Sequence, residues 1–527
     1  MILVLALDGL DPQLIRHFQR QGRLPALSAL DREGASGLLR STIPPVSIPA
    51  WSTFLTGVGP GRHGLFDFTR LEGGRIRFQS ALDRRVPTLL ELLDAAGIRV
   101  ASLGVPTTYP VPRLRHGAVL AGFDSPFQGR PDARALHPPS LWHALEAGGL
   151  DLRTSTLPEG RKGRGWHASA SQRILESVTR RSAQAHRLLE RAEHDVLLVH
   201  FQAADTAGHH FFRYFDPASP RHDARHPERA AVLPRIYDAL DQAVSELRQK
   251  AGAKATCVVI SDHGMGPASD CVIHLNAWLE QSRLLVRRPR AARHLLEPLR
   301  SAALAWLPRE LQARLFRALR EGAVAGVETA LRLGDIDRQH SVAFSEESST
   351  LPGIWVLQPD RTESLIRQLR RWDAVRRVYR REDVFRGPAR ECAPHLLLEL
   401  RHSLVRTPRG YRGPACRRLL PRELDGVRGA GMNGVHRPWG VVAAAGPGVP
   451  RGLRLQGTWI GDLAPTLLAR LGLDVPDWME GRVLPSLAPS TRRSERPRPD
   501  RGRAPLELSP TQSAALEQRL RALGYLG

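Results

Sequence analysis

Residues Ile2–Leu7 form the uninterrupted apolar run Ile-Leu-Val-Leu-Ala-Leu, which ends at the carboxylate of Asp8. A run of this length is typical of a β-strand that is buried on both faces. Two similar, largely apolar runs follow at Val196–Phe201 and Ala255–Ile260. Strands that are apolar throughout are typical of parallel sheets covered by helices on both sides, so the three runs predict an α/β fold.

Amphipathic stretches of helical length lie between the expected strands. In Pro87–Ala96, for example, four leucines form one apolar stripe, and Gly97 ends the pattern. The other expected helices are Pro12–Gln21, Ser171–His194, Pro234–Lys250 and Gly461–Leu471, and further strands are expected at Ile98–Leu103 and Gly440–Ala445. This alternation predicts a mostly parallel central sheet flanked by helices.

Two regions depart from the alternation. Residues 271–345 are arginine-rich and helical in pattern, with few strand signals, so we expect a helical cap inserted into the core or a peripheral helical elaboration. Residues 488–508 are rich in proline, serine and arginine, as flexible linkers are, and residues 509–527 are expected to form a C-terminal helix. The core is then divided between residues 1–270 and 346–487.

The charge of the chain is strongly positive. Its 527 residues include 76 basic and 53 acidic side chains, which give a formal net charge of +23. Such a charge is typical of proteins that bind nucleic acid or anionic membranes. All basic residues except three are arginines, however, and they are spread over the whole chain. We expect no specific nucleic-acid partner, and a basic nucleic-acid or membrane-surface binder stays the non-enzymatic alternative.

The cysteines and apolar segments limit the cellular context. The four cysteines are scattered and form no CxxC pair, which argues against a disulfide framework or a cysteine zinc site. No run of about 18 apolar residues occurs, so no transmembrane segment is expected. The apolar start of the chain is short and lacks a basic segment before it, so it is interpreted as a buried strand and not as a signal peptide. We expect a cytoplasmic enzyme of unknown oligomeric state.

Acidic and histidine side chains come directly after the apolar strands. Asp8 follows the first strand, Asp205 and His209 follow the second, and Asp262 and His263 follow the third. Ligand-binding groups of open α/β sheets gather beyond the carboxyl ends of the strands. Because Asp205 and His209 are four residues apart, they would point the same way on one helical turn.

His436 completes a set of three aspartates and three histidines. Carboxylates and imidazoles are ligands of zinc and also of manganese. A single aspartate after a strand is more often a helix cap, and a single histidine is more often an ordinary core or surface side chain. The ordered set as a whole predicts a metal centre.

The hydroxyl of Ser47 is the candidate nucleophile. Ser47 lies just before Pro49, which fits the first turn of a helix. The free amides and the dipole at such a helix start attract a phosphate oxyanion. A metal ion at the serine oxygen can make it nucleophilic at neutral pH, whereas without a metal Ser47 would serve only as a helix cap.

Together these motifs resemble the alkaline phosphatase superfamily, and within it the type I phosphodiesterase/nucleotide pyrophosphatase family, more narrowly its soluble bacterial branch of predicted phosphohydrolases and phosphomutases. The motifs occur in family order between Asp8 and about Leu484. They are Asp8, Pro45-Val-Ser47-Ile-Pro49-Ala-Trp51, Thr56-Gly57-Val-Gly-Pro60-Gly-Arg-His63-Gly64, Asp205-Thr-Ala-Gly-His209, Ser261-Asp262-His263-Gly264-Met265-Gly266 and Gly434-Val-His436-Arg-Pro438. Within them, His63 is interpreted as a structural residue.

The resemblance implies an alkaline-phosphatase-like core and two divalent metal ions, usually zinc in this family and manganese in mutase relatives. By position, Asp205, His209 and His436 would hold one ion, and Asp8, Asp262 and His263 would hold the other. Ser47 would attack the phosphorus of a small-molecule phosphoester and form a phosphoseryl intermediate. The implied activity is that of a phosphodiesterase or nucleotide pyrophosphatase, and a phosphomutase or phosphotransferase reaction on the same site is the alternative.

Departures from the family pattern bear on the substrate. Nucleotide pyrophosphatases typically carry an oxyanion-binding asparagine about 21 positions after the nucleophile, where this chain has Phe68. No aromatic pair that would sandwich a nucleobase can be assigned. The nucleophile motif also lacks the arginine that sulfatases need for formylglycine formation, which argues against a sulfatase. The substrate, the choice between monoester, diester and mutase chemistry, and the choice between zinc and manganese stay open.

Overall fold

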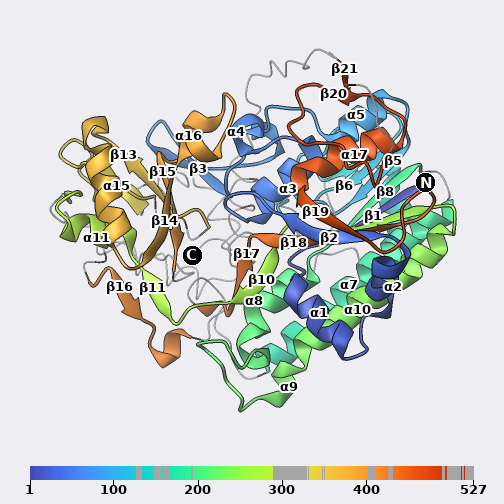
Figure 1. Cartoon of the computed structure of the whole chain (residues 1–527), viewed down its shortest axis with the longest axis horizontal. Coiled ribbons are helices and arrows are strands. Elements are labelled where there is room, and N and C mark those ends of the chain that lie inside the picture. Colours follow the sequence, from blue (N-terminus) through green and yellow to red (C-terminus); the bar gives the residue numbers. More distant parts are fainter. Residues whose placement is uncertain are drawn as a thin grey trace.

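The computed structural model describes residues 1–125, 133–146, 157, 163, 165–191, 194–288, 329, 332–346, 348, 350–401, 411, 413–424, 431–488, 493, 494, 512 and 516. These residues form a large lobe on a nine-stranded sheet and a smaller lobe on a four-stranded sheet (Figure 1). Among them, no helix has both the length and the apolar character that crossing a membrane requires.

The centre of the large sheet is parallel. Its order is β19-β2-β18-β9-β1-β8-β5-β6-β7, and β1 pairs in parallel with both β8 and β9. The parallel central strands are β1 (Ile2–Leu7), β8 (Val196–Phe201), β9 (Thr256–Ile260), β5 (Val100–Leu103) and β6 (Ala118–Leu120). The predicted α/β fold with a mostly parallel sheet is therefore confirmed.

The outer strands of this sheet are β2 (Ala35–Arg40), β18 (Trp439–Ala445), β19 (Leu453–Trp459) and β7 (Leu136–His137). β18 runs antiparallel to both of its neighbours, and β7 runs antiparallel to β6. β2 and β19 form no apolar run in the sequence, because exposed and buried residues are mixed along both strands. An apolar run also carries no direction, so the antiparallel course of β18 could not be inferred from it.

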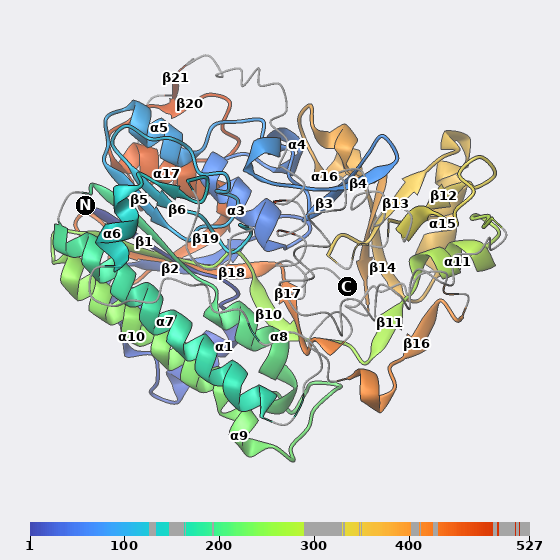
Figure 2. The ribbon, with the colours of Figure 1, turned by 180° about the vertical axis from the view of Figure 1, so that it is seen from behind.

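Side chains of β1 alternate between two cores. Leu3, Leu5 and Leu7 belong to one apolar cluster, whereas Val4 and Ala6 belong to the other. The first face is covered by α1 (Pro12–Arg20), α2 (Pro25–Glu33), α7 (Trp166–Arg191), α8 (Ala203–Phe215) and α10 (Val232–Ala251), and the second by α3 (Ser47–Thr56), α5 (Leu89–Ala95) and α17 (Leu463–Arg470) (Figure 2). This two-sided cover explains why the central strands are apolar throughout.

The smaller lobe has its own antiparallel sheet and core. The sheet order is β12-β13-β15-β14, with bounds Ala343–Phe344, Gly353–Val356, Leu396–Leu400 and Val375–Arg380. Apolar side chains of α11 (Leu275–Gln281) and α15 (Thr362–Arg371) pack in the same cluster as these strands. The sheet thus lies on both sides of residue 345, where the sequence places a boundary between cap and core.

Several parts of the predicted domain division lie outside the described residues. Most of the expected helical cap falls there, namely 289–328, 330 and 331. Of the expected linker and C-terminal helix, only 488, 493, 494, 512 and 516 are described. The division into 1–270, 271–345, 346–487, 488–508 and 509–527 stays a prediction.

Candidate metal and nucleophile site

The ends of three adjacent strands bring the predicted acidic residues together. β9, β1 and β8 are neighbours in the sheet, so Asp262, Asp8 and the start of α8 lie at one edge. The amide of Asp205 donates to the carbonyl of Asp8 over 3.1 Å. Gly9 has a φ of +72°, and a Cβ there would lie 2.7 Å from the Cα of Asp205, so this close approach requires glycine.

The first ligand group is Asp205, His209 and His436. α8 places Asp205 and His209 one turn apart, and β17 (Gly434–Arg437) brings in His436 by pairing antiparallel with β10 (Gly264–Pro267). Asp205 Oδ1 lies 3.2 Å from Nε2 of His209 and 3.2 Å from Nε2 of His436. The two Nε2 atoms are 2.9 Å apart. Ligands about 2.1 Å from a tetrahedral zinc ion are separated by about 3.4 Å, so these spacings suit one ion.

Backbone carbonyls fix the tautomers of both imidazoles in this group. His209 Nδ1 donates to the carbonyl of Gly434 over 2.8 Å, and His436 Nδ1 donates to the carbonyl of Pro45 over 2.9 Å. A carbonyl can only accept, so in the neutral rings each Nε2 is the acceptor nitrogen. Two acceptor nitrogens facing each other beside a carboxylate form a donor set that suits a cation.

The second ligand group is Asp8, Asp262 and His263, whose ligand atoms all lie within 4.8 Å of one another. His263 Nε2 is 3.4 Å from Asp8 Oδ1 and 3.3 Å from Asp262 Oδ2. His263 Nδ1 donates to the carbonyl of Gly264 over 3.0 Å, which again leaves Nε2 as the acceptor. All three side chains are fully buried.

The second group concentrates negative charge in a buried place. Asp8 Oδ1 and both oxygens of Asp262 lack a hydrogen-bond partner of normal geometry among the described residues, although the nearby amide of Gly9 favours the ionised form of Asp262. Burial, together with the nearby charges of Asp8 and Asp205, raises the pKa of Asp262 well above its usual range. A carboxylate in such surroundings needs either a proton or a bound cation.

The pKa values of His263 and His209 are shifted in opposite directions. Burial and the charge of His436 lower the pKa of His263 to about 4, which keeps its ring neutral and able to bind a metal. Burial also acts to lower the pKa of His209, but the carboxylate of Asp205, the carbonyl of Gly434 and the charge of Asp8 together outweigh it, so the pKa of His209 is raised.

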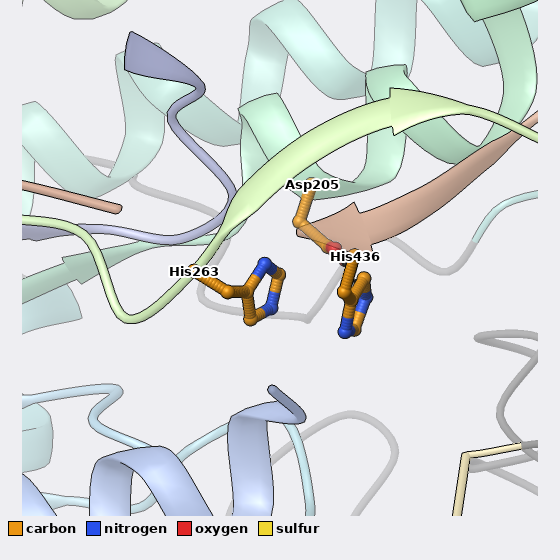
Figure 3. A group of neighbouring side chains, drawn as sticks. All are labelled: Asp205, His263 and His436. Carbon is orange, nitrogen blue, oxygen red and sulfur yellow. Dashed lines mark ion pairs between the residues drawn. The ribbon is translucent and has the colours of Figure 1, made fainter. Parts of the chain in front are cut away.

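His263 joins the two groups. Its ring stacks on that of His436 with centroids 3.7 Å apart, and His263, His436 and Asp205 also form a candidate ligand group (Figure 3). The two groups are therefore parts of one continuous cluster. The structure brings all six predicted ligand residues together, and the division of the six between two ions stays a prediction.

Ser47 faces this cluster. Its Oγ lies 3.3 Å from Nε2 of His263, and its side chain is fully buried. Ser47 is the first residue of α3, and Val46 occupies the N-cap position. The sequence places Ser47 just before the helix, as a possible cap, whereas its hydroxyl is directed at the ligand cluster instead.

Two residues with no role in the sequence analysis contact Asp8. Trp51 Nε1 donates to Asp8 Oδ2 over 3.0 Å, and His200 Nε2 lies 2.9 Å from the same oxygen. The available signal for His200 is an imidazole in the otherwise apolar run Val196–Phe201. For Trp51 it is the spacing of four residues after Ser47, which is one helical turn.

His63 and Phe68 contact residues other than the six candidate ligands. His63 Nδ1 accepts from the amide of Leu65 and Nε2 lies 3.0 Å from Thr53 Oγ1, so the ring ties α3 to the following turn. Burial, followed by the charge of Arg84, lowers the pKa of His63 to about 3. Phe68 packs in an apolar cluster with Val46 and Ile48, the two neighbours of Ser47.

Known proteins resemble this chain in sequence and in fold. The sequence matches the type I phosphodiesterase/nucleotide pyrophosphatase family over residues 2–371, which include every candidate site residue except His436. No curated protein matches the chain. Phosphonoacetate hydrolase from Sinorhizobium meliloti 1021, in complex with phosphonoformate, is similar in structure with a TM-score of 0.53 and 15% identity, over 88% of this chain and 94% of that chain.

Human ectonucleotide pyrophosphatase/phosphodiesterase 5 is also similar, with a TM-score of 0.50 and 12% identity, over 93% of this chain and 100% of that chain. At such identities the structural likeness concerns the fold alone. The family match, by contrast, covers well over half of the chain. The chain belongs to the type I phosphodiesterase/nucleotide pyrophosphatase family and is an enzyme of the class that acts on phosphoester bonds.

Proposed function

We propose that the protein is a metal-dependent phosphoester hydrolase in which Ser47 is the nucleophile. One observation carries the proposal beyond family membership. Ser47 Oγ lies 3.3 Å from Nε2 of His263, a residue of the second ligand group whose ring also stacks on that of His436 in the first group. This distance matches the separation between two ligand atoms of one metal ion, so the hydroxyl lies where a further ligand of the ion held by His263 would lie.

The donor set fits two divalent ions. Asp205, His209 and His436 would hold one, and Asp8, Asp262 and His263 would hold the other. Imidazole and carboxylate ligands favour zinc, and manganese is the second choice. When bound, the two ions supply positive charge that lowers the pKa of the Ser47 hydroxyl and stabilises the attacking and leaving oxygens of an in-line displacement.

The residues of the chain then perform two steps. Ser47 Oγ loses its proton to solvent and forms a bond to phosphorus while the bond from phosphorus to the leaving oxygen breaks, and the leaving oxygen takes a proton from solvent and departs as an alcohol. Ser47 begins α3, so the helix dipole and the amides of the first turn favour negative charge at this point. Water then cleaves the phosphoseryl bond, releasing phosphate or a phosphomonoester and restoring the serine hydroxyl.

The substrate is proposed only as a class, a small-molecule phosphoester. Phe68 occupies the place where nucleotide pyrophosphatases have an amide, and Val46 and Ile48 pack with it beside Ser47. The surroundings of the nucleophile are therefore apolar on this side. Phosphotransfer to an alcohol shares the first step and stays the alternative. The cytoplasmic location remains a prediction.

Turnover measurements test the proposal. We expect the metal-loaded protein to hydrolyse 4-nitrophenyl phosphate or bis(4-nitrophenyl) phosphate with zinc or manganese. Ser47→Ala should lower kcat by about three orders of magnitude or more, as loss of a nucleophile does, and should keep its metal content. The matched control is Ser52→Ala, because Ser52 is a buried serine of α3 whose hydroxyl donates only to the carbonyl of Ile48.

Each competing function predicts a different result. Full activity in Ser47→Ala would reject the nucleophile. A product transferred mainly to an added alcohol would favour the phosphotransferase. Salt-dependent binding of nucleic acid without any metal-dependent turnover would favour the basic binder.

A further inference from the structure

The two oxygens of Asp8 have different surroundings. Oδ2 accepts a hydrogen bond from Trp51 Nε1 over 3.0 Å and lies 2.9 Å from His200 Nε2. Oδ1 has no donor among the described residues and lies 3.4 Å from His263 Nε2. The carboxylate is thus held through one oxygen, and the other is directed into the ligand cluster.

His200 is well placed for this contact. It is the residue of β8 opposite Ala6 of β1, two positions before Asp8, and its side chain is only 3% exposed. An imidazole buried in a central strand costs free energy unless its polar atoms are hydrogen-bonded. Because an ionised carboxylate only accepts hydrogen bonds, Nε2 of His200 must carry the proton.

Trp51 connects the same oxygen to the nucleophile helix. It lies one turn after Ser47 on α3, and its side chain is fully buried. Its ring meets that of His200 edge to face, with centroids 5.1 Å apart. One rigid helix therefore presents the Ser47 hydroxyl and also donates to Asp8.

We propose that Trp51 and His200 are positioning residues for Asp8. They engage Oδ2, so that Oδ1 alone is offered to the ion of the Asp8, Asp262 and His263 group. This inference rests on the proposed function, since it requires that the group binds a metal. Hydrogen-bond partners of metal ligands typically change metal affinity by 10–100-fold when they are removed.

The inference predicts an effect on one ion only. The other group is oriented by different contacts, from His209 to the carbonyl of Gly434 and from His436 to the carbonyl of Pro45. Removing the donors to Asp8 should raise the dissociation constant of one metal ion and leave that of the other ion unchanged. A general loosening of the fold would change both.

The test is a metal titration of the metal-free full-length protein against a chromogenic chelator, with Zn²⁺ and with Co²⁺. Trp51→Phe keeps an aromatic ring and removes the N–H group. His200→Phe removes the imidazole, and His200→Gln restores a donor of similar reach. We expect Trp51→Phe and His200→Phe each to weaken one site about tenfold or more, and His200→Gln to recover most of the affinity.

Phe54→Leu is the matched control. Phe54 is a buried aromatic residue of α3 that packs against Trp51 at a ring distance of 5.8 Å. It should lower the melting temperature and leave both metal affinities unchanged. The absorption bands of bound Co²⁺ should shift for one site in Trp51→Phe and stay constant in Phe54→Leu.

The possible failures are distinguishable. A wild-type protein that binds no metal would reject the proposed function itself. A wild-type protein that binds two ions, with both dissociation constants unchanged in Trp51→Phe and His200→Phe, would overturn the positioning role alone. Equal weakening of both sites, in these variants and in Phe54→Leu, would also overturn it.

Discussion

Buried carboxylates in the large lobe and at the junction of the lobes have opposite hydrogen-bonding states. At the ligand edge of the large sheet, Asp8 Oδ1 and Asp262 lack well-formed donors among the described residues. At the junction, Asp67 accepts hydrogen bonds from the hydroxyls of Ser348 and Thr350 and from the amide of Phe68. Donors that satisfy a carboxylate favour a structural role, whereas a buried carboxylate without them needs a proton or a bound cation, and the neighbouring histidines of the ligand cluster favour the cation there.

Among the variants that test this comparison, Asp262→Asn is expected to have the largest effect on activity. Removing one ligand carboxylate should lower kcat/KM by about a thousandfold, in the range for loss of an electrostatic partner of the transition state. The metal-free variant should melt at the same temperature as wild type or higher, because burial and neighbouring charges disfavour the ionised carboxylate. Steady-state kinetics and thermal unfolding measure the two effects, and lower stability of the metal-free variant would contradict this interpretation.

Asp67→Ala should lower the stability of the protein and leave its metal binding unchanged, which is the reverse of the expectation for Asp262→Asn. The variant leaves the hydroxyls of Ser348 and Thr350 without their buried acceptor, so the free energy of unfolding should fall by about 1–3 kcal/mol. The number of bound metal ions should stay that of wild type. Urea unfolding and metal analysis test this, and a variant that loses metal while keeping its stability would show that the two kinds of carboxylate are not separable.

A smaller, pH-dependent effect is expected for Glu346 in the smaller lobe. Burial raises its pKa to about 7 from an ordinary value of 4.5, although Trp355 Nε1 donates to its Oε1 over 3.1 Å. The folded protein holds this proton more tightly than the unfolded chain, so ionisation destabilises the fold increasingly between about pH 4.5 and 7. Glu346→Gln should therefore raise the melting temperature at pH 8 and change it little at pH 4, and an equal shift at both values would contradict the raised pKa.

The strands of the fold can be predicted from the sequence only where burial on both faces requires a continuous run of apolar residues. The sequence indicates β1, β8 and β9 because each is covered on both faces and is therefore an apolar run. β2 and β19 mix exposed and buried residues, which leaves no such run. The smaller sheet consists of short strands whose pairing joins distant residues, such as Gly353 with Leu397, so no local pattern indicates it.

The candidate site was predictable where a short motif follows a strand. Asp8, Asp205, His209, Asp262 and His263 were identified in this way, and their positions after the carboxyl ends of strands explain why they meet, whereas His436 follows no strand and was identified with the family motif Gly434-Val-His436-Arg-Pro438. The contacts that orient them were not, because His200 and Asp8 are 192 positions apart and Trp51 and Asp8 are 43 apart. The stacking of His263 on His436, which joins the two ligand groups, likewise depends on the pairing of β10 with β17.

Diffraction from zinc-soaked crystals at the zinc absorption edge tests the central claim most directly. We predict two anomalous peaks, one among Asp205, His209 and His436 and one among Asp8, Asp262 and His263, with Ser47 Oγ about 2–2.2 Å from the second. Soaking Ser47→Ala crystals should keep both peaks. Peaks outside these six side chains, or no peak at all in zinc-soaked wild-type crystals, would contradict the account.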